Sequence, residues 1–168
     1  MDRLWAPWRM KYILQADLKG EGCIFCTKPA ENNDEKNFIL FRGRHVFVII
    51  NIFPYNSGHL MIAPYRHVPS IEHLTEEEVT ELFTLSQEVV KILRKVLDPD
   101  GFNIGMNIGR VAGAGFDQHV HLHIVPRWNG DTNFMPVIAD VKVIPEAMED
   151  TYRRLKPEFD ELKKRWKK

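Results

Sequence analysis

The stretch that decides the fold is residues 119–125, His-Val-His-Leu-His-Ile-Val, where three histidines alternate with apolar residues. Successive side chains of a β-strand point to opposite faces of the sheet, so the alternation predicts a strand with its imidazoles on one face. Imidazoles two positions apart would stand about 6.6 to 6.8 Å from one another. A buried imidazole needs a hydrogen-bond partner, so packing alone does not explain three in register. The pattern favours either metal ligation or nucleophilic catalysis by one imidazole that its neighbours orient or supply with protons.

A glycine-rich segment precedes this row. Residues 107–116 read Asn-Ile-Gly-Arg-Val-Ala-Gly-Ala-Gly-Phe, which is typical of a strand end followed by a loop. Such loops expose backbone N–H groups that can hold an anion, although a simple turn has the same composition. Because the loop comes directly before the histidines, it suggests a phosphate held over an imidazole.

The rest of the chain indicates an α+β fold with an antiparallel sheet. Thr75 and Glu78 form a capping box that opens a helix over Thr75–Leu97, and residues 98–101, Asp-Pro-Asp-Gly, stop it. Strands before and after this helix, without regular β-α-β alternation, predict an antiparallel sheet with the long helix packed on it. The predicted strands are Phe38–Phe41, His45–Asn51, His59–Ala63, Phe102–Ile108 and Val120–Pro126.

A second helix is expected from Pro145 to the C-terminus. Its apolar residues recur at spacings of four and three, so the stripe should pack on the body of the protein or on a second subunit. Pro157 should kink or split this helix. The basic end at residues 163–168 is interpreted as a solvated helix terminus. The stripe comprises Met148, Tyr152, Leu155, Phe159, Leu162 and Trp166.

Length and composition predict one domain over residues 1–168. The chain is 44% hydrophobic and 27% charged, which suffices for one core over about residues 20–130. An aromatic segment, 1–19, would precede the core, and a C-terminal helical extension, 131–168, would follow it.

Charge and targeting signals limit the partners. Lysine and arginine number 23, as do aspartate and glutamate, so the net charge is zero and neither nucleic acid nor a membrane surface is an expected partner. A local pocket could still hold a small anion. No apolar run approaches the roughly 18 residues of a spanning helix, and the first residues resemble no signal peptide. We expect a cytoplasmic protein.

Cys23 and Cys26 form a single C-x-x-C, which could be redox-active, zinc-binding or two free thiols. A thioredoxin-like motif should follow a buried strand and open a helix. Here residues 17–22 are polar and Lys28-Pro29 follows, which argues against redox activity. Zinc needs four ligands, and two histidines could complete the set.

The chain resembles the histidine-triad (HIT) family of nucleotide hydrolases and transferases, whose signature, three histidines alternating with apolar residues, is met by residues 119–125. Residues 51–64, Asn-Ile-Phe-Pro-Tyr-Asn-Ser-Gly-His-Leu-Met-Ile-Ala-Pro, look like the nucleoside-binding strand pair of that family. Residues 4–9 and 126–134 look like its diadenosine tetraphosphate phosphorylase-like branch. The resemblance implies a five-stranded antiparallel sheet and, commonly, a homodimer.

The resemblance also implies roles for individual residues. His121 would attack an α-phosphate as the nucleophile, while His119 and His123 would bind phosphate oxygens, orient His121 or assist the leaving group. His59 matches a fourth histidine that supports the triad, and Asn51 matches a residue that contacts ribose hydroxyls. Phosphate oxygens would be held by Asn107, Gly113, Ala114, Gly115 and Phe116.

One departure concerns the loop before the triad. Many hydrolases of the family carry Gln or Ser there, whereas residues 114–118 read Ala-Gly-Phe-Asp-Gln. This departure shifts the expected phosphate contacts from side chains to backbone N–H groups.

Zinc-containing HIT proteins use a C-x-x-C with two histidines, so the resemblance implies a structural Zn²⁺ on Cys23, Cys26, His67 and His119. No organic cofactor is expected, and the chemistry requires no divalent metal. His45 and His73 match no motif and are expected at the surface or in caps.

The function expected from the resemblance is cleavage of a phosphoanhydride at the α-phosphate of a dinucleoside polyphosphate, such as diadenosine tetraphosphate. A nucleotidyl-histidine intermediate would be resolved by phosphorolysis or hydrolysis. The alternatives are a nucleoside phosphoramidase-type hydrolase, a non-enzymatic nucleotide-binding adaptor, and a metalloenzyme with His119, His121 and His123 on one ion.

Overall fold

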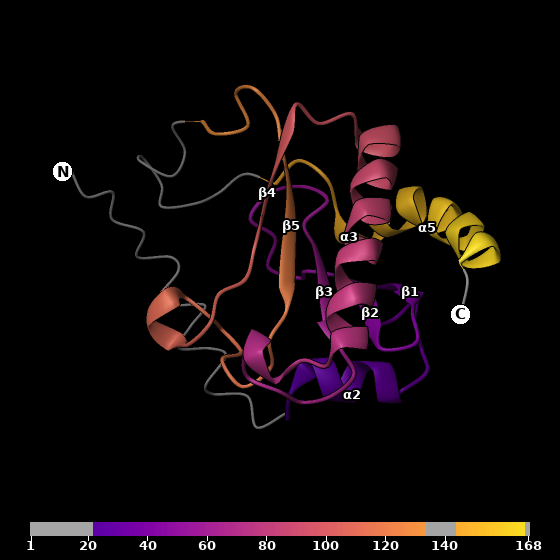
Figure 1. The fold of residues 1–168 in the computed structure, drawn as a ribbon. Coiled ribbons are helices and arrows are strands. Elements are labelled where there is room, and N and C mark those ends of the chain that lie inside the picture. Colours follow the sequence, from indigo (N-terminus) through magenta and orange to yellow (C-terminus); the bar gives the residue numbers. More distant parts are fainter. Residues whose placement is uncertain (1–21, 134–143, 167–168) are drawn as a thin grey trace.

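The computed structural model describes residues 22–133 and 144–166, so the expected aromatic segment 1–19 lies outside the described residues. Five strands form one sheet in the order β1-β2-β3-β5-β4, and every neighbouring pair is antiparallel (Figure 1). This sheet confirms the predicted α+β class. The strands are β1 (Ile39–Arg42), β2 (Val46–Ile50), β3 (Leu60–Pro64), β4 (Gly101–Gly105) and β5 (Leu122–Arg127).

Helix α3 (Glu76–Leu97) is the long helix predicted from the sequence. The Thr75 hydroxyl accepts from the N–H of Glu78, and the Glu78 carboxylate accepts from the N–H of Thr75, so both halves of the capping box form. Asp98 ends the helix in the left-handed conformation. Within the ranges that the structure describes, no helix is long and apolar enough to cross a membrane.

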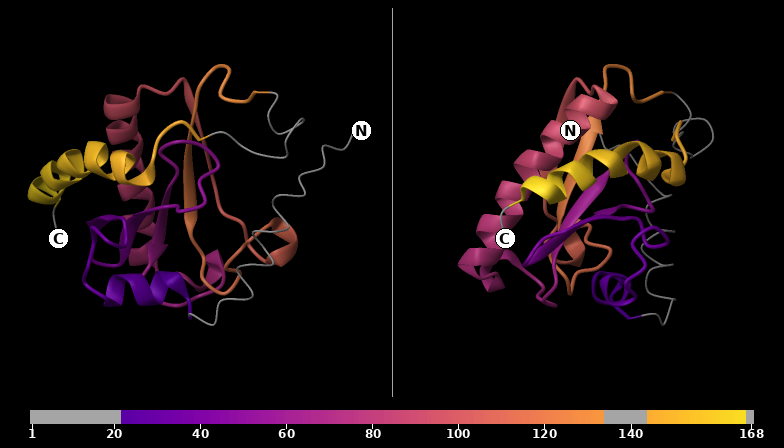
Figure 2. Two further views of the ribbon diagram at one scale, coloured as in Figure 1. Left: turned by 180° about the vertical axis from the view of Figure 1, so that it is seen from behind. Right: turned by 90° about the vertical axis from the view of Figure 1, so that its right-hand side faces the viewer.

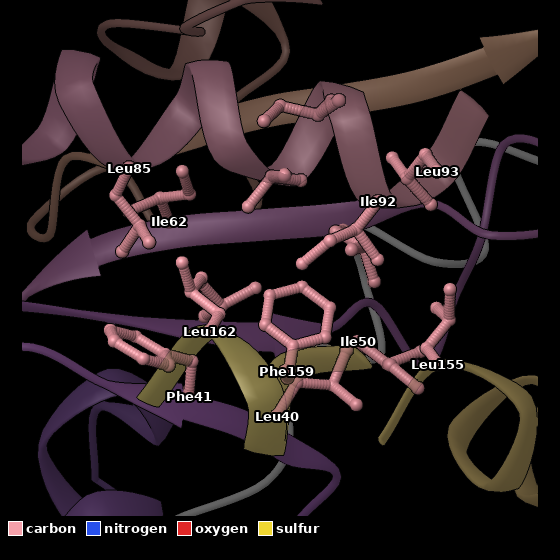
Figure 3. Packing of buried hydrophobic residues seen from close by; sticks show 14 of the residues in the cluster. Leu40, Phe41, Ile50, Ile62, Leu85, Ile92, Leu93, Leu155, Phe159 and Leu162 are labelled. Atoms are coloured by element: carbon pink, nitrogen blue, oxygen red, sulfur yellow. The ribbon is translucent and has the colours of Figure 1, made fainter. Parts of the chain in front are cut away.

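Helices α3 and α5 (Met148–Arg165) lie on the same face of the sheet (Figures 1 and 2). Alternate residues of the strands, such as Val48, Ile62 and Ile124, point to this face and form the main core. Figure 3 shows Leu155, Phe159 and Leu162 of α5 packed between strand residues and α3. The main core therefore includes the C-terminal helix.

The opposite face of the sheet carries a second, smaller cluster. Phe47, Ile49, Met61 and Ala63 point to this side and meet Phe25, which belongs to the short helix α2 (Ile24–Ala30). Strands β2 and β3 are consequently buried on both faces. The histidine row lies on this second face, away from α3, because the alternating Leu122 and Ile124 belong to the main core.

Helix α5 runs unbroken through Pro157, so the proline does not split it, which was one of the two outcomes predicted for this position. Proline removes one N–H from the helix, yet buried residues anchor the chain on both sides of it: Tyr152 and Leu155 before, Phe159 and Leu162 after. Their common burial in the main core holds the helix together across the missing hydrogen bond. The apolar stripe thus packs on the body of the same chain.

Three strands are shorter than predicted, and β2 lacks one residue of its predicted range at each end. β4 ends at Gly105, where its pairing with His123 of β5 ends, and does not reach Ile108. β5 begins at Leu122, which pairs with Ile62, because the preceding chain leaves the ladder and the N–H of Val120 donates to the carbonyl of Val68 at 2.8 Å. His119 and His121 therefore lie on the segment that leads into β5.

Candidate active site and metal cluster

The three histidines of the row lie together beneath the surface. His119, His121 and His123 are all at most 9% exposed. The ring centroids of His121 and His123 are 4.6 Å apart, and the planes are nearly perpendicular at 73°. The structure thus brings the imidazoles of the predicted nucleophile and its neighbour into contact.

The hydrogen bond of His121 determines which of its nitrogens can react. Its Nδ1 lies 2.8 Å from the carbonyl oxygen of His119. A carbonyl oxygen can only accept, so Nδ1 carries the hydrogen and the neutral ring keeps its lone pair on Nε2. Burial lowers the pKa of His121, which favours this neutral form. The geometry therefore provides a nitrogen nucleophile at neutral pH.

A chain of hydrogen bonds fixes the tautomers of His59 and His123. The backbone N–H of Tyr55 donates to Nδ1 of His59 at 3.0 Å, so His59 carries its hydrogen on Nε2. That Nε2–H donates to Nδ1 of His123 at 2.9 Å, which leaves the hydrogen of neutral His123 on Nε2. Burial, followed by the charges of the neighbouring imidazoles, lowers the pKa of His59 to about 3, so the ring of His59 stays neutral. His123 thus offers a donor N–H beside the nucleophile.

The segment before β3 places His59 at this position. Gly58 has φ +74°, and a Cβ on it would lie 2.4 Å from Cδ1 of Leu97, so only glycine fits this turn. Asn51 is buried: its Oδ1 accepts from the N–H of Phe53 at 2.9 Å, and its Nδ2 lies 3.4 Å from Nδ1 of His59. Asn51 therefore lies in the same hydrogen-bond network as the relay.

A polar anchor that the sequence did not reveal fastens this segment. The Nδ2 of Asn56 donates to the carbonyl of Pro126 at 3.1 Å and to Asp131 at 2.7 Å. Arg127 also donates to Asp131 and holds the pKa of that carboxyl below its usual range. Asn56 and Asp131 each lie in a segment that resembles the family, but they are 75 residues apart, and the resemblance gave neither a role nor a partner.

The glycine-rich loop is more structured than predicted. Residues Arg110–Ala112 form a 3-10 turn between Gly109 and Gly113, both of which have positive φ. The N–H of Gly113 donates to the carbonyl of Arg110 at 2.9 Å, and that of Ala114 faces the carbonyl of Gly109 at 3.4 Å. These two N–H groups are engaged within the loop, which weakens their assignment as phosphate donors. Asn107 is half-buried two residues beyond β4.

The second site is a cluster of Cys23, Cys26, His67 and His119, whose potential ligand atoms lie within 4.8 Å of one another. Nδ1 of His119 is 3.2 Å from Sγ of Cys23, 3.6 Å from Sγ of Cys26 and 3.3 Å from Nδ1 of His67. Tetrahedral zinc with bonds of about 2.3 Å to sulfur and 2.05 Å to nitrogen would place its ligands about 3.3 to 3.8 Å apart. The four residues therefore fit zinc.

The surroundings of the cluster also suit a cation. Nε2 of His119 lies 2.8 Å from the carbonyl oxygen of Pro64, so Nε2 carries the hydrogen and Nδ1 faces the sulfurs as an acceptor. Burial raises the pKa of the Cys23 thiol to about 11, so the thiol stays protonated unless a cation displaces the proton. Burial also lowers the pKa of His119 to about 4.

The structure around the C-x-x-C corrects the expectation that this motif does not open a helix. Cys23 is the N-cap of α2, which contains Pro29, so the motif does open a helix despite the polar residues before it. Proline is tolerated because α2 is only one to two turns long and docks through the buried Phe25. The argument against redox activity is therefore the contact of two imidazoles with the thiols, and not the absence of a helix.

The two histidines without a motif lie apart from both sites. His73 is exposed at the end of the 3-10 turn η1 (Ile71–His73), and its carbonyl accepts from Arg66. The backbone N–H of His45 donates to the carboxylate of Glu81. Both positions agree with the expectation of surface or capping residues.

Comparisons with known proteins agree with this architecture. A family model described as the HIT domain matches residues 32–130. The chain is 39% identical over 165 residues to the AP-4-A phosphorylase of Mycobacterium tuberculosis, an alignment that covers 95% of this chain and 85% of that protein. It is 30% identical over 125 residues to the bis(5'-adenosyl)-triphosphatase of Dictyostelium discoideum, covering 74% and 83%.

A solved structure supports the same fold. The Zn-bound histidine triad family protein from Mycobacterium smegmatis aligns with a TM-score of 0.68 at 25% identity, covering 85% of this chain and 96% of that one. An antiparallel five-stranded sheet with its histidine row facing away from the long helix defines a histidine-triad domain. The chain belongs to the HIT family.

Proposed function

We propose that the protein cleaves a dinucleoside polyphosphate, such as diadenosine tetraphosphate, at an α-phosphate through a nucleotidyl-His121 intermediate. The observation that carries this proposal is the pair of assigned tautomers: a lone pair on Nε2 of His121 beside an N–H on Nε2 of His123. Such a pair suits attack on phosphorus together with a hydrogen bond to the leaving oxygen. The likeness to the M. tuberculosis AP-4-A phosphorylase supports this substrate class.

In the first half-reaction, Nε2 of His121 forms a bond to the α-phosphorus, and the bond from phosphorus to the bridging oxygen breaks. The electron pair of that bond leaves with the polyphosphate oxygen, which departs as an anion and accepts a hydrogen bond from Nε2–H of His123. His59 keeps that hydrogen on Nε2 of His123 through its own hydrogen bond to Nδ1. Neutral imidazoles suit this step because they add no negative charge near the phosphates.

In the second half-reaction, an oxygen of inorganic phosphate or water attacks the same phosphorus and the bond to His121 breaks. Phosphate yields a nucleoside diphosphate, and water yields the monophosphate. We assign Asn51 to the ribose hydroxyls, and Asn107 with the backbone N–H groups of Gly115 and Phe116 to the phosphate oxygens.

We further propose that Cys23, Cys26, His67 and His119 hold a structural zinc ion. The ligand spacing and the oriented ring of His119 support this assignment. When bound, the ion supplies a cross-link between the N-terminus of α2, the segment after β3 and the histidine row. His119 then serves as a ligand and not as a proton donor to the substrate.

The test is incubation with diadenosine tetraphosphate, with and without inorganic phosphate, followed by product analysis. ADP plus ATP formed only with phosphate supports a phosphorylase, whereas AMP plus ATP from water supports a hydrolase. His121→Ala should abolish both turnover and a nucleotidyl adduct trapped by acid-free quenching, and the exposed His73→Ala serves as the matched control. Full turnover by His121→Ala would overturn the mechanism.

Two alternatives give other results in the same assay. Turnover of adenosine 5'-phosphoramidate with no cleavage of dinucleoside polyphosphates would favour a phosphoramidase. Tight nucleotide binding without turnover across the panel would favour an adaptor.

A further inference from the structure

Phe25 lies between the two cysteines of the C-x-x-C, and its side chain is only 1% exposed. Its ring covers the ring of His121, with centroids 4.5 Å apart and planes inclined at 30°. It also contacts the ring of His119, at 5.2 Å between centroids. One aromatic ring therefore touches both a member of the metal cluster and the proposed nucleophile.

Two contacts fix the ring of His121, and both involve residues that belong to the metal cluster or lie between its cysteines. The carbonyl of His119 accepts from Nδ1 of His121 at 2.8 Å, and the segment between Cys23 and Cys26 presents Phe25 to its ring face. Rotation of the imidazole about its Cβ–Cγ bond would break the hydrogen bond and sweep the ring edge into Phe25. These two contacts together select the orientation in which Nε2 is the free nitrogen.

The same ring reaches the glycine-rich loop. Phe25 meets Phe116 edge to face, with centroids 6.0 Å apart and planes at 81°. Phe116 belongs to the loop that we assign to the phosphate oxygens. Phe25 thus contacts both the nucleophile and this loop, and can fix the position of one relative to the other.

We propose that Phe25 is a positioning residue that holds His121 in its reactive orientation and couples this orientation to the metal cluster. This inference rests on the proposed function, because it concerns the geometry of the same nucleophile. It assigns Phe25 a purpose beyond filling the smaller core cluster.

Phe47 provides a matched control for that plain packing role. It belongs to the same cluster and is fully buried, but its aromatic partner is Tyr65, with centroids 5.2 Å apart. Phe25→Leu and Phe47→Leu remove the same atoms from the same cluster. A difference between them therefore reports what the Phe25 ring does for His121.

The experiment compares both variants with the zinc-loaded wild type in four measurements: zinc content, unfolding midpoint, kcat and KM for diadenosine tetraphosphate, and the imidazole 15N NMR shifts of His121. We expect both variants to keep zinc and to lose similar stability. Phe25→Leu should lower kcat about tenfold, the factor that corresponds to one aromatic-pair contact, and leave KM within about twofold. Its His121 shifts should move toward the average of two tautomers, whereas those of Phe47→Leu should not.

Phe25→Tyr keeps the ring and should restore most of kcat and the wild-type shifts. Phe25→Met keeps the volume without the ring and replaces Phe25→Leu if that variant does not fold. Equal kcat and equal shifts in the Phe25 and Phe47 variants would overturn the proposal, as would loss of zinc from a folded Phe25 variant. The NMR comparison requires no turnover, so an absence of any nucleotide cleavage would refute the proposed function and leave this test in place.

Discussion

The His59 relay can be dissected by two substitutions that remove its two hydrogen bonds separately. His59→Gln can still donate from its Nε2 to His123, but loses the acceptor for the N–H of Tyr55. His59→Asn can still accept from Tyr55 through its Oδ1, but loses the donor to His123. Each variant therefore removes one of the two hydrogen bonds that the fully buried wild-type ring makes with Tyr55 and His123.

The expected stability losses are therefore similar. Removing one partner of a buried hydrogen bond costs about 1 to 3 kcal/mol. For a chain of this length, that free energy lowers Tm by roughly 2 to 12 °C. Thermal unfolding of both variants should fall in this range.

The effects on catalysis should differ. His59→Asn removes the His59 donor from Nδ1 of His123, so the hydrogen of His123 is no longer confined to Nε2. We therefore expect kcat to fall by about 100-fold or more, the contribution of one hydrogen-bond donor to the charge that develops on the leaving oxygen. His59→Gln preserves that donor, and kcat should stay within about tenfold of the wild type. The assay is steady-state cleavage of diadenosine tetraphosphate at a temperature where both variants are folded. Equal losses of kcat at equal stability, or a more active His59→Asn, would refute the tautomer relay.

Four further predictions concern pH, metal, the Glu81 carboxylate and the expected dimer. In the unfolded chain, His59 binds a proton below about pH 6.5, whereas in the folded chain it does so only near pH 3. The free energy of unfolding should therefore fall by up to about 1.4 kcal/mol per pH unit as the pH decreases through this window. The urea midpoint should fall less steeply with decreasing pH for His59→Asn, and identical pH dependences would contradict the assignment. The purified chain should bind zinc in equimolar amount, and Cys26→Ala should lose the metal along with several kcal/mol of stability; unchanged metal analysis would argue against the cluster. The carboxylate of Glu81 accepts three backbone N–H groups of residues 44–46, so Glu81→Gln should cost about 2 kcal/mol in chemical unfolding, and a change within error would show that water replaces these bonds. Ile104 is half exposed on β4, an edge strand of the described sheet, so if the expected homodimer forms there, Ile104→Lys should yield monomers in sedimentation; an unchanged mass would place any dimer elsewhere.

Local signals account for what could be predicted of the fold. The capping box at Thr75 and the 3.6-residue periodicity behind it determine α3 almost to the residue. The continuity of α5 through Pro157 could not be predicted in the same way, because it depends on packing against strands more than 100 residues away. The helix at the C-x-x-C was also missed, since its stability comes from Phe25 entering a cluster formed by β1, β2 and β3.

The candidate site likewise contains some features that local sequence patterns predict and others that depend on the fold. The alternation at residues 119–125 and the C-x-x-C carry their information in spacing, so the histidine row and the two cysteines could be named from sequence. His67 and His119 could be named as candidate metal ligands only through the resemblance to the family. Tyr55 and Phe25 act through a backbone N–H and a ring face, which no residue pattern encodes. The internal hydrogen bonds of Gly113 and Ala114 likewise depend on the turn that the loop adopts.

Backbone groups and a neighbouring imidazole fix the tautomers of the site, and this suits a chain with no net charge to the highly anionic substrate that we propose. A carboxylate beside an imidazole would orient it, but would also raise its pKa and repel the phosphates. Here His121 is oriented by a carbonyl and His59 by a backbone N–H, and His123 is oriented in turn by His59. These dipoles fix the proton positions without adding a negative charge, and burial keeps the rings of His59 and His121 neutral. Introducing a carboxylate at this point, as in His59→Glu, should therefore impair substrate binding as well as turnover. A His59→Glu variant with unchanged KM would show that the neutrality of the relay does not matter for binding.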